Sequence, residues 1–247
     1  EAFDFKRRSI LTQTTKRFEN AFLELNFNVR MNEFLYNGLS IKEHLLKLSE
    51  NSSKQFAQTL NPGVENVLGL RIPDLRKLAA GIAKSDWEAY LATASTFYME
   101  ERMLQGMVLG CIKPDNDIEK YLARVTRFVK IINSWSVCDT FKFAGGKKYV
   151  SLHADRIWEY LKTFMHADGE YEIRFGVVMA MVYFIDDAHI DELLNLLDGI
   201  RHEGYYVKMA VAWALSYCFV KYPEKTMDYL SRSSLDNFTY NKSIQKA

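Results

Sequence analysis

The chain has 247 residues, of which 48% are hydrophobic and 26% charged, which is the composition of an ordinary globular protein. Its 32 basic and 31 acidic side chains give a net charge of +1, which excludes nucleic-acid binding through overall charge and leaves only a local patch for it. No apolar run approaches the roughly 20 residues that cross a bilayer, and the amino terminus lacks an apolar secretory region. We therefore expect a cytoplasmic protein without a membrane segment.

Residues 1–39 are expected to form an amino-terminal extension. Phe18, Phe22 and Leu25 share one helical face, which predicts a single amphipathic helix in this part of the chain. Met31 is a candidate natural start, with the preceding residues as an addition. The remaining residues, 40–247, predict one all-α domain.

The helical pattern becomes regular from Ser40 onward. Ser40 can cap the helix that starts IKEHLLKLSE, and Glu43, three residues later, completes a capping box. Pro73 stands in the first turn of GLRIPDLRKLAAGIAK, and Ser85 or Asp86 can cap DWEAYLATA. Further helices are expected in MEERMLQGMVLGCI, DNDIEKYLARVTRFVKII, KKYVSLHADRIWEYLKTFM, EYEIRFGVVMAMVYFI, DELLNLLDGI, YYVKMAVAWALSYCFVKY and EKTMDYL, and no segment predicts a strand.

Three of these helices share a sequence pattern. EERMLQGMVLG, EIRFGVVMAMV and YVKMAVAWALS align with Arg102, Arg174 and Lys208 at one position. The first two are 72 residues apart (174 − 102), or two steps of 36, and the last two are 34 apart (208 − 174), so a missing copy falls near residue 138. A period near 35 with two helices per unit predicts a helical solenoid. The tetratricopeptide pattern is absent, which favours a HEAT/armadillo-like solenoid with a concave binding groove.

The stretch NSWSVCDTFKF, residues 133–143, carries the most informative pair of residues within an apolar helical pattern. Trp135 and Asp139 are four residues apart, so an indole and a carboxylate share one helical face. Corresponding helices of a solenoid line one wall, which would bring Arg174 and Trp213 into the same groove. The residues alone leave alternatives open: Asp139 as an ordinary surface carboxylate, Trp213 as a core residue and Arg174 as one half of a surface ion pair.

Together these segments resemble a known family, the AlkD-type alkylpurine DNA glycosylases built from HEAT-like repeats. The resemblance runs from about Ser40 to the carboxy terminus and is carried by GLRIPDLRKLA, Trp135-x-x-x-Asp139, EIRFGVVMA and KMAVAWALSY in that order. It implies excision of cationic alkylated purines, such as 3-methyladenine and 7-methylguanine, from double-stranded DNA without base flipping. It also implies that Asp139 is the catalytic carboxylate, that Trp135 and Trp213 are aromatic walls, and that Arg174 is a groove arginine.

These residue types suit that chemistry. An alkylated purine cation is already a good leaving group, so a general acid is unnecessary. As the glycosidic bond breaks, positive charge moves onto the deoxyribose, where a carboxylate such as Asp139 can stabilise it and orient the attacking water. The ring faces of Trp135 and Trp213 can hold a cationic sugar, and the fork of Arg174 can clamp a flanking phosphate.

The sequence departs from the family pattern at two places. Ser216 stands where the family has a second groove arginine, and it can form a hydrogen bond but supplies no charge. A family tyrosine near the lesion has no counterpart in TLNPGVENVLG. Lys142, Lys147, Lys148 and Lys208 are the candidates to replace lost phosphate contacts, although any one of them alone is more typical of a solvated surface.

Two other functions stay open. One is a non-catalytic relative that binds distorted or branched DNA by shape, which Ser216 and the missing tyrosine favour. The other is a scaffold that binds a peptide or helix on its concave face. A basic stripe on the concave wall would separate the DNA functions from the scaffold.

No cofactor and no metal are expected, and the chain is expected to act as a monomer. The five histidines show no paired spacing for zinc, and no P-loop or GxGxxG motif is present. Cys111, Cys138 and Cys218 lie in apolar helical stretches without CxxC spacing. We expect all three to be buried free thiols in a reducing compartment.

Overall fold

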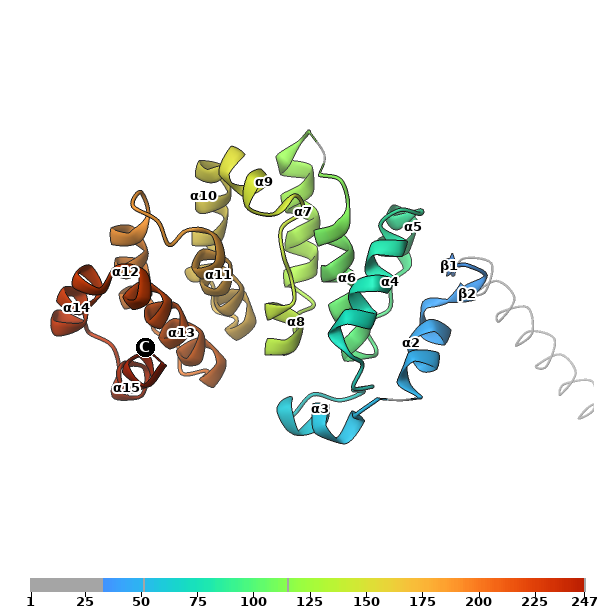
Figure 1. The fold of residues 1–247 in the computed structure, drawn as a ribbon, viewed down its shortest axis with the longest axis horizontal. Helices are drawn as coiled ribbons and strands as arrows, with labels where there is room; N and C mark the ends of the chain where they lie inside the picture. Colours follow the sequence, from blue (N-terminus) through green and yellow to red (C-terminus); the bar gives the residue numbers. More distant parts are fainter. Residues whose placement is uncertain (1–32, 51, 115, 247) are drawn as a thin grey trace, which may run out of the picture.

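The computed structural model describes residues 33–50, 52–114 and 116–246. They form an arched row of helices that runs from α2 (Ile41–Ser49) at one end to α14 (Pro223–Arg232) and α15 (Asn237–Lys246) at the other (Figure 1). The predicted all-α solenoid is confirmed. The helix expected around Phe18, Phe22 and Leu25 lies outside the described residues, and the boundary after residue 39 stays a prediction.

An inner row of helices runs along the lower, open side of the arch in Figure 1. Its members contact one another in chain order. They are α4 (Ile72–Ile82), α6 (Met99–Cys111), α8 (Trp135–Asp139), α11 (Glu170–Tyr183), α13 (Tyr205–Lys221) and α15. The helices that alternate with them along the chain form the outer row: α5 (Trp87–Thr93), α7 (Ile118–Val129), α10 (Ala154–Met165), α12 (Ile190–Gly199) and α14. Two further helices, α3 (Lys54–Leu60) and α9 (Gly146–Leu152), stand outside this alternation.

The inner row carries the predicted repeat. The starts of α6, α8 and α11 are 36 (135 − 99) and 35 (170 − 135) residues apart, and α13 starts 35 residues later (205 − 170). The missing copy near residue 138 is therefore α8. It has only five helical residues, so the prediction that 133–143 lies within a longer apolar helix is wrong. The chain leaves the helix because Phe141 and Phe143 turn into the core beyond it, where both are 1% exposed.

Capping residues fix several helix starts as the sequence predicted. Ser40 and Glu43 form the expected capping box at α2, and Asp86 caps α5 by accepting a hydrogen bond from the Ala89 amide. One predicted helix is divided: α9 and α10 are separated at His153, whose φ of −122° and ψ of 30° are not helical. No helix of the described residues has the length and apolar character needed to span a membrane.

A short hairpin precedes α2 and corrects the expectation that no strand is present. β1 (Leu35–Tyr36) pairs antiparallel with β2 (Leu39–Ser40). The connecting Asn37 and Gly38 have φ values of +48° and +77°, the left-handed backbone that an Asn-Gly turn adopts readily. The Asn-Gly pair is the local signal for this hairpin.

Aromatic packing holds the segment that follows α8. The Phe141 ring stacks on Phe128 at 5.4 Å and contacts Phe175 of α11 at the same centroid distance. The Tyr121 hydroxyl accepts a 2.8 Å hydrogen bond from the Ala144 amide. A Cβ at Gly110 of α6 would lie 2.5 Å from the Lys142 carbonyl oxygen, so only glycine allows this close approach. The end of α8 is thus fixed against the two inner helices on either side.

Candidate functional site

Nearly every residue of α8 is anchored by its surroundings. Ser134 caps the helix, and Val137 and Cys138 are fully buried beneath it. The Trp135 indole nitrogen donates to the Leu60 carbonyl at 2.9 Å. The Ser136 hydroxyl donates to the Asn61 side-chain oxygen at 2.7 Å, and Asp139 accepts a hydrogen bond from Arg174. A five-residue helix is not stable by itself, so these tertiary contacts define it. They hold Trp135 and Asp139 in fixed positions on the predicted common face.

Asp139 is bound by the full fork of Arg174. The Arg174 Nε donates to one carboxylate oxygen at 3.0 Å and Nη2 to the other at 2.6 Å. The Arg174 side chain is 6% exposed and that of Asp139 is 15% exposed. Arg174 uses one lone pair on each oxygen, so the carboxylate can still accept hydrogen bonds from its open side. The pair therefore presents an oriented carboxylate at a partly exposed position.

The orientation of Arg174 differs from the predicted phosphate clamp. Its Nη1 donates to the Tyr206 carbonyl at 2.8 Å, so both arms of the guanidinium are engaged within the protein. Burial disfavours its charge, but the hydrogen bonds and charge of Asp139 outweigh this and raise the pKa of Arg174. Arg174 thus links α8, α11 and α13 and remains a cation.

The repeat position shared by Arg102, Arg174 and Lys208 has one structural role. Arg102 donates to the Ile131 carbonyl at 2.8 Å, shortly before α8 begins. Lys208 lies 3.9 Å from Asp236, directly before α15, and 2.8 Å from Glu203. Each cation therefore ties its own inner helix to the region where the next one starts. Because Lys208 is paired with Glu203, its ammonium group is poorly available for the predicted phosphate contact.

Trp213 lies on α13 and is partly buried against the core. Its ring meets the exposed Tyr217 ring edge-on at a centroid distance of 6.0 Å. No hydrogen bond or ring contact among the described residues joins Trp213 to Trp135 or Asp139, so its place as a second aromatic wall stays a prediction. The structure does bring Trp135, Asp139 and Arg174 together.

Ser216 is buried and bonded within its own helix. It is 4% exposed, and its hydroxyl donates to the Trp213 carbonyl of its own helix at 2.7 Å. Because α13 is apolar on nearly all sides, a small residue at this position is covered by its neighbours. The prediction that Ser216 contacts DNA does not fit this placement.

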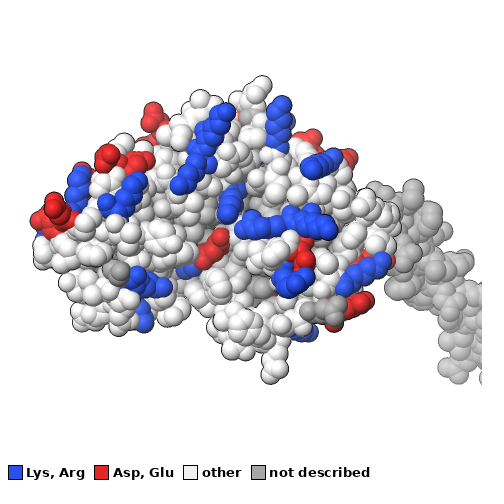
Figure 2. All heavy atoms as spheres, viewed as in Figure 1, with Lys and Arg blue, Asp and Glu red and all other residues white. Residues whose placement is uncertain are grey.

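Lys142, Lys147 and Lys148 are exposed, as a DNA-contact role requires. Lys142 lies three residues after the end of α8 (142 − 139), and the other two lie at the start of α9. Figure 2 shows Lys and Arg side chains spread across the centre of this face, over α4, α8 and α9, while acidic side chains gather near α12 and α14. We call Lys142, Lys147 and Lys148 the lysine patch.

Two tyrosines beside the site were not singled out from the sequence. Tyr171 and Tyr206 stack with ring centroids 5.8 Å apart, and each lies in the first turn of an inner helix. Burial raises the pKa of Tyr171, and the charge of Glu170 adds to the effect. They are 35 residues apart (206 − 171), so the repeat itself was the signal that could have identified them.

The cysteines and metal-binding residue types add little to the site. Cys138 and Cys218 are buried free thiols as expected, whereas Cys111 is exposed because it stands at the end of α6. Burial raises the pKa of Cys138, and the adjacent Asp139 charge raises it further. Across the described ranges, no group of three or more His, Cys, Asp or Glu side chains is arranged to hold a metal ion.

Comparison with known proteins identifies the family. The model of the family described as DNA alkylation repair enzyme matches residues 41–246, which is most of the chain. A search of curated proteins gives no match. The family match covers α8, α11 and α13, and so includes the Asp139–Arg174 pair. The chain therefore belongs to the DNA alkylation repair enzyme family, and its role is in the repair of alkylated DNA.

Proposed function

We propose that the chain is a DNA glycosylase that excises cationic alkylated purines, of the 3-methyladenine and 7-methylguanine class, from duplex DNA without base flipping. The observation that supports this most is the Asp139 carboxylate, which a buried arginine fork orients and which remains 15% exposed. Family membership supports a substrate in alkylated DNA. The fixed carboxylate of Asp139 supports a hydrolysis in which the sugar carbon gains positive charge.

The reaction needs a group that stabilises a cation more strongly in the transition state than in the ground state. The bond between C1′ and the purine nitrogen breaks, and its electron pair neutralises the alkylated base. Positive charge then develops on the deoxyribose, where the fixed charge of Asp139 is favourable. Water bonds to C1′ and loses a proton to Asp139 or to solvent, which leaves an abasic sugar and a free base.

Arg174 supports this step by positioning Asp139. A fork with two parallel hydrogen bonds fixes the plane of the Asp139 carboxylate. The adjacent Trp135 is itself fixed by its hydrogen bond to Leu60, so its ring offers a rigid face for a cationic sugar. In this account Arg174 acts through Asp139 and does not touch DNA.

DNA binding is assigned to the lysine patch. Its three exposed ammonium groups follow α8 closely in the chain and can contact phosphates. Since Ser216 is buried and Lys208 is ion-paired, this face offers fewer candidate residues for phosphate contacts than the sequence predicted. That shortage favours, as a second candidate function, a non-catalytic relative that binds distorted or branched DNA by its shape.

Product analysis of methylated duplex DNA separates the two functions. The wild type is expected to release free 7-methylguanine and leave abasic sites, and Asp139→Asn is expected to release neither. Asp228→Asn is a matched control, because that carboxylate is exposed on the outer helix α14. Tight binding of branched DNA by the wild type, with no base released from methylated duplex, would favour the second function.

A further inference from the structure

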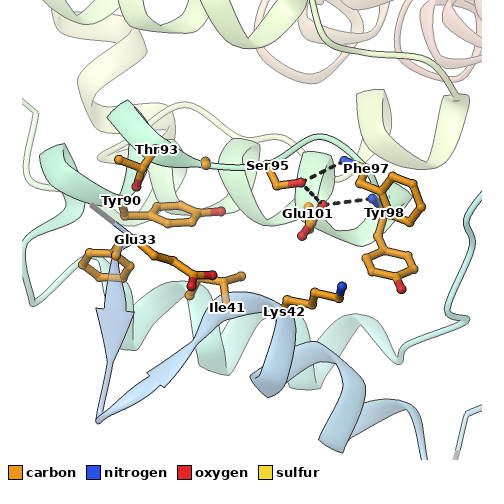
Figure 3. A pocket seen from close by; sticks show the side chains of 11 residues that line it. Glu33, Ile41, Lys42, Tyr90, Thr93, Ser95, Phe97, Tyr98 and Glu101 are labelled. Atoms are coloured by element: carbon orange, nitrogen blue, oxygen red, sulfur yellow. Dashed lines mark hydrogen bonds between the residues drawn. The ribbon is translucent and has the colours of Figure 1, made fainter. Parts of the chain in front are cut away.

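A separate cavity lies at the amino-terminal end of the arch, between the hairpin, α2, α5 and the start of α6 (Figure 3). Its volume is about 180 Å³, and none of its lining residues belongs to the candidate site around Asp139. Aromatic and aliphatic side chains form its walls. They are Phe34, Ile41, Phe97 and Tyr98.

One buried hydroxyl in this cavity lacks a hydrogen-bond partner in the described part of the chain. Tyr90 is 2% exposed, and its hydroxyl makes no hydrogen bond among the described residues. Figure 3 shows this hydroxyl pointing across the cavity towards Ser95 and Glu101. A buried hydroxyl without a hydrogen bond is costly, so the group is suited to a ligand that supplies one.

Glu101 provides a carboxylate on the same side. It is 4% exposed, and one of its oxygens accepts hydrogen bonds from the Ser95 hydroxyl at 2.6 Å and the Tyr98 amide at 2.9 Å. The other oxygen accepts no hydrogen bond from the described part of the chain. Glu33 adds a second, exposed carboxylate to the lining, against the single ammonium group of Lys42. The lining is therefore negative overall.

We propose that this cavity binds a small organic ammonium ion, with its nitrogen between the Tyr90 hydroxyl and the unpaired Glu101 oxygen. An ammonium group carries three donors and can satisfy both oxygens at once, and its charge matches the carboxylate. The alkyl part of the ligand contacts Phe34, Ile41 and Phe97, while the ring faces attract the cation. A neutral alcohol of the same length lacks the charge and is expected to bind much more weakly.

The volume limits the size of the ligand. A cavity of about 180 Å³ with apolar walls and one oxygen-lined side suits a small unbranched alkylamine. We therefore choose pentane-1,5-diamine as the probe and pentane-1,5-diol as its uncharged counterpart.

The test is calorimetric titration and thermal unfolding of the full chain with both probes. The diamine is expected to bind and to raise the Tm, and the diol is not. Tyr90→Phe and Glu101→Gln are each expected to weaken diamine binding at least tenfold, while Tyr240→Phe, an exposed tyrosine on α15, is expected to bind as the wild type does. The Gln side chain keeps an oxygen acceptor for Ser95 and Tyr98, so the fold is retained.

Tyr90→Phe also separates binding from folding. Because the Tyr90 hydroxyl makes no hydrogen bond within the ranges that the structure describes, its removal is expected to leave the Tm of the ligand-free protein unchanged or raised, and to abolish the increase that the diamine causes. Equal binding of diamine and diol would overturn the proposal. Diamine binding that is unaffected in Tyr90→Phe and Glu101→Gln would also overturn it, because that result indicates attraction to the acidic surface in general.

Discussion

Arg174 and Lys208 occupy equivalent positions on neighbouring inner helices, but their surroundings differ. Arg174 is 6% exposed, and its two carboxylate hydrogen bonds go to one partner, Asp139, that is itself only 15% exposed. Lys208 pairs with Glu203, whose side chain is 97% exposed, and lies 3.9 Å from the half-exposed Asp236. Both cations join one inner helix to the next. Only the Arg174 pair excludes most of the surrounding water.

This difference shows how a repeat produces a site at one of its copies. The helix-linking role needs a cation and a nearby acceptor, and a lysine with exposed partners meets that need. A rigid, oriented carboxylate needs the planar fork of arginine and low exposure, which only the copy at α8 and α11 provides. The shortness of α8 contributes, because its carboxylate stands at the last helical residue and within reach of α11.

The strongest test of the comparison is to remove each cation. Arg174→Met leaves Asp139 largely buried without its partner, and we expect the free energy of unfolding to fall by about 3–5 kcal/mol. Lys208→Met is expected to have a much smaller effect, because water can solvate its partners. Urea unfolding of both variants measures the difference. Similar losses in the two variants would show that burial does not distinguish the positions.

The lysine patch offers a test through DNA binding. Alanine at Lys142, Lys147 and Lys148 together is expected to reduce the salt dependence of DNA affinity by about one unit of slope per lost contact. Lys208→Ala, which removes an ion-paired lysine, is expected to leave the slope unchanged. Binding measured across a range of salt concentrations decides this, and a reduced slope in Lys208→Ala alone would reverse the assignment.

Replacement of Trp135 and replacement of Trp213 are expected to lower the free energy of unfolding by different amounts. This difference is smaller than the one between the Arg174 and Lys208 variants. Trp135→Phe removes the hydrogen bond to the Leu60 carbonyl, which is worth about 1 kcal/mol in a typical case. Trp213→Phe removes an indole that makes no hydrogen bond among the described residues. Chemical unfolding of both variants gives the difference, and an equal loss would show that the Leu60 contact does not hold α8.

The smallest expected effect is on thiol reactivity. Burial raises the pKa of Cys138, and it raises that of Cys218 to about 12, so at pH 8 both stay protonated and inaccessible. The exposed Cys111 is expected to react first with a thiol reagent. Arg174→Met is expected to speed labelling of Cys138 beneath α8 more than that of Cys218. Equal acceleration of both would indicate global loosening instead of a local change.

The sequence predicted the architecture well because the repeat spacing and the capping residues can be recognised within short segments of the chain. The spacing of Arg102, Arg174 and Lys208 predicted the inner helices α6, α8, α11 and α13, and the capping residues Ser40 and Asp86 predicted two helix starts. The helices α3 and α15 were not predicted. Neither has a strongly apolar face, so their positions depend on contacts made by the folded chain.

The sequence predicted that Trp135, Asp139 and Arg174 share one groove, and the structure brings these three together, but the sequence did not predict their geometry. Trp135 and Asp139 share a helical face at a spacing of four residues, which a sequence can show. The sequence could not show that Arg174 bonds to Asp139. Arg174 lies 35 residues away, and the direction of its side chain is set by packing between helices. The burial of Ser216 was missed for the same reason, since neighbouring inner helices cover α13.

The central claim is that the carboxylate of Asp139 stabilises the transition state. The most direct measurement is the single-turnover rate of 7-methylguanine release by Asp139→Asn, with the affinity for the same DNA measured in parallel. We predict a rate at least about 100-fold below that of the wild type, the scale for loss of a preorganised electrostatic group, with DNA affinity nearly unchanged. Release at the wild-type rate by a folded Asp139→Asn protein would contradict the claim.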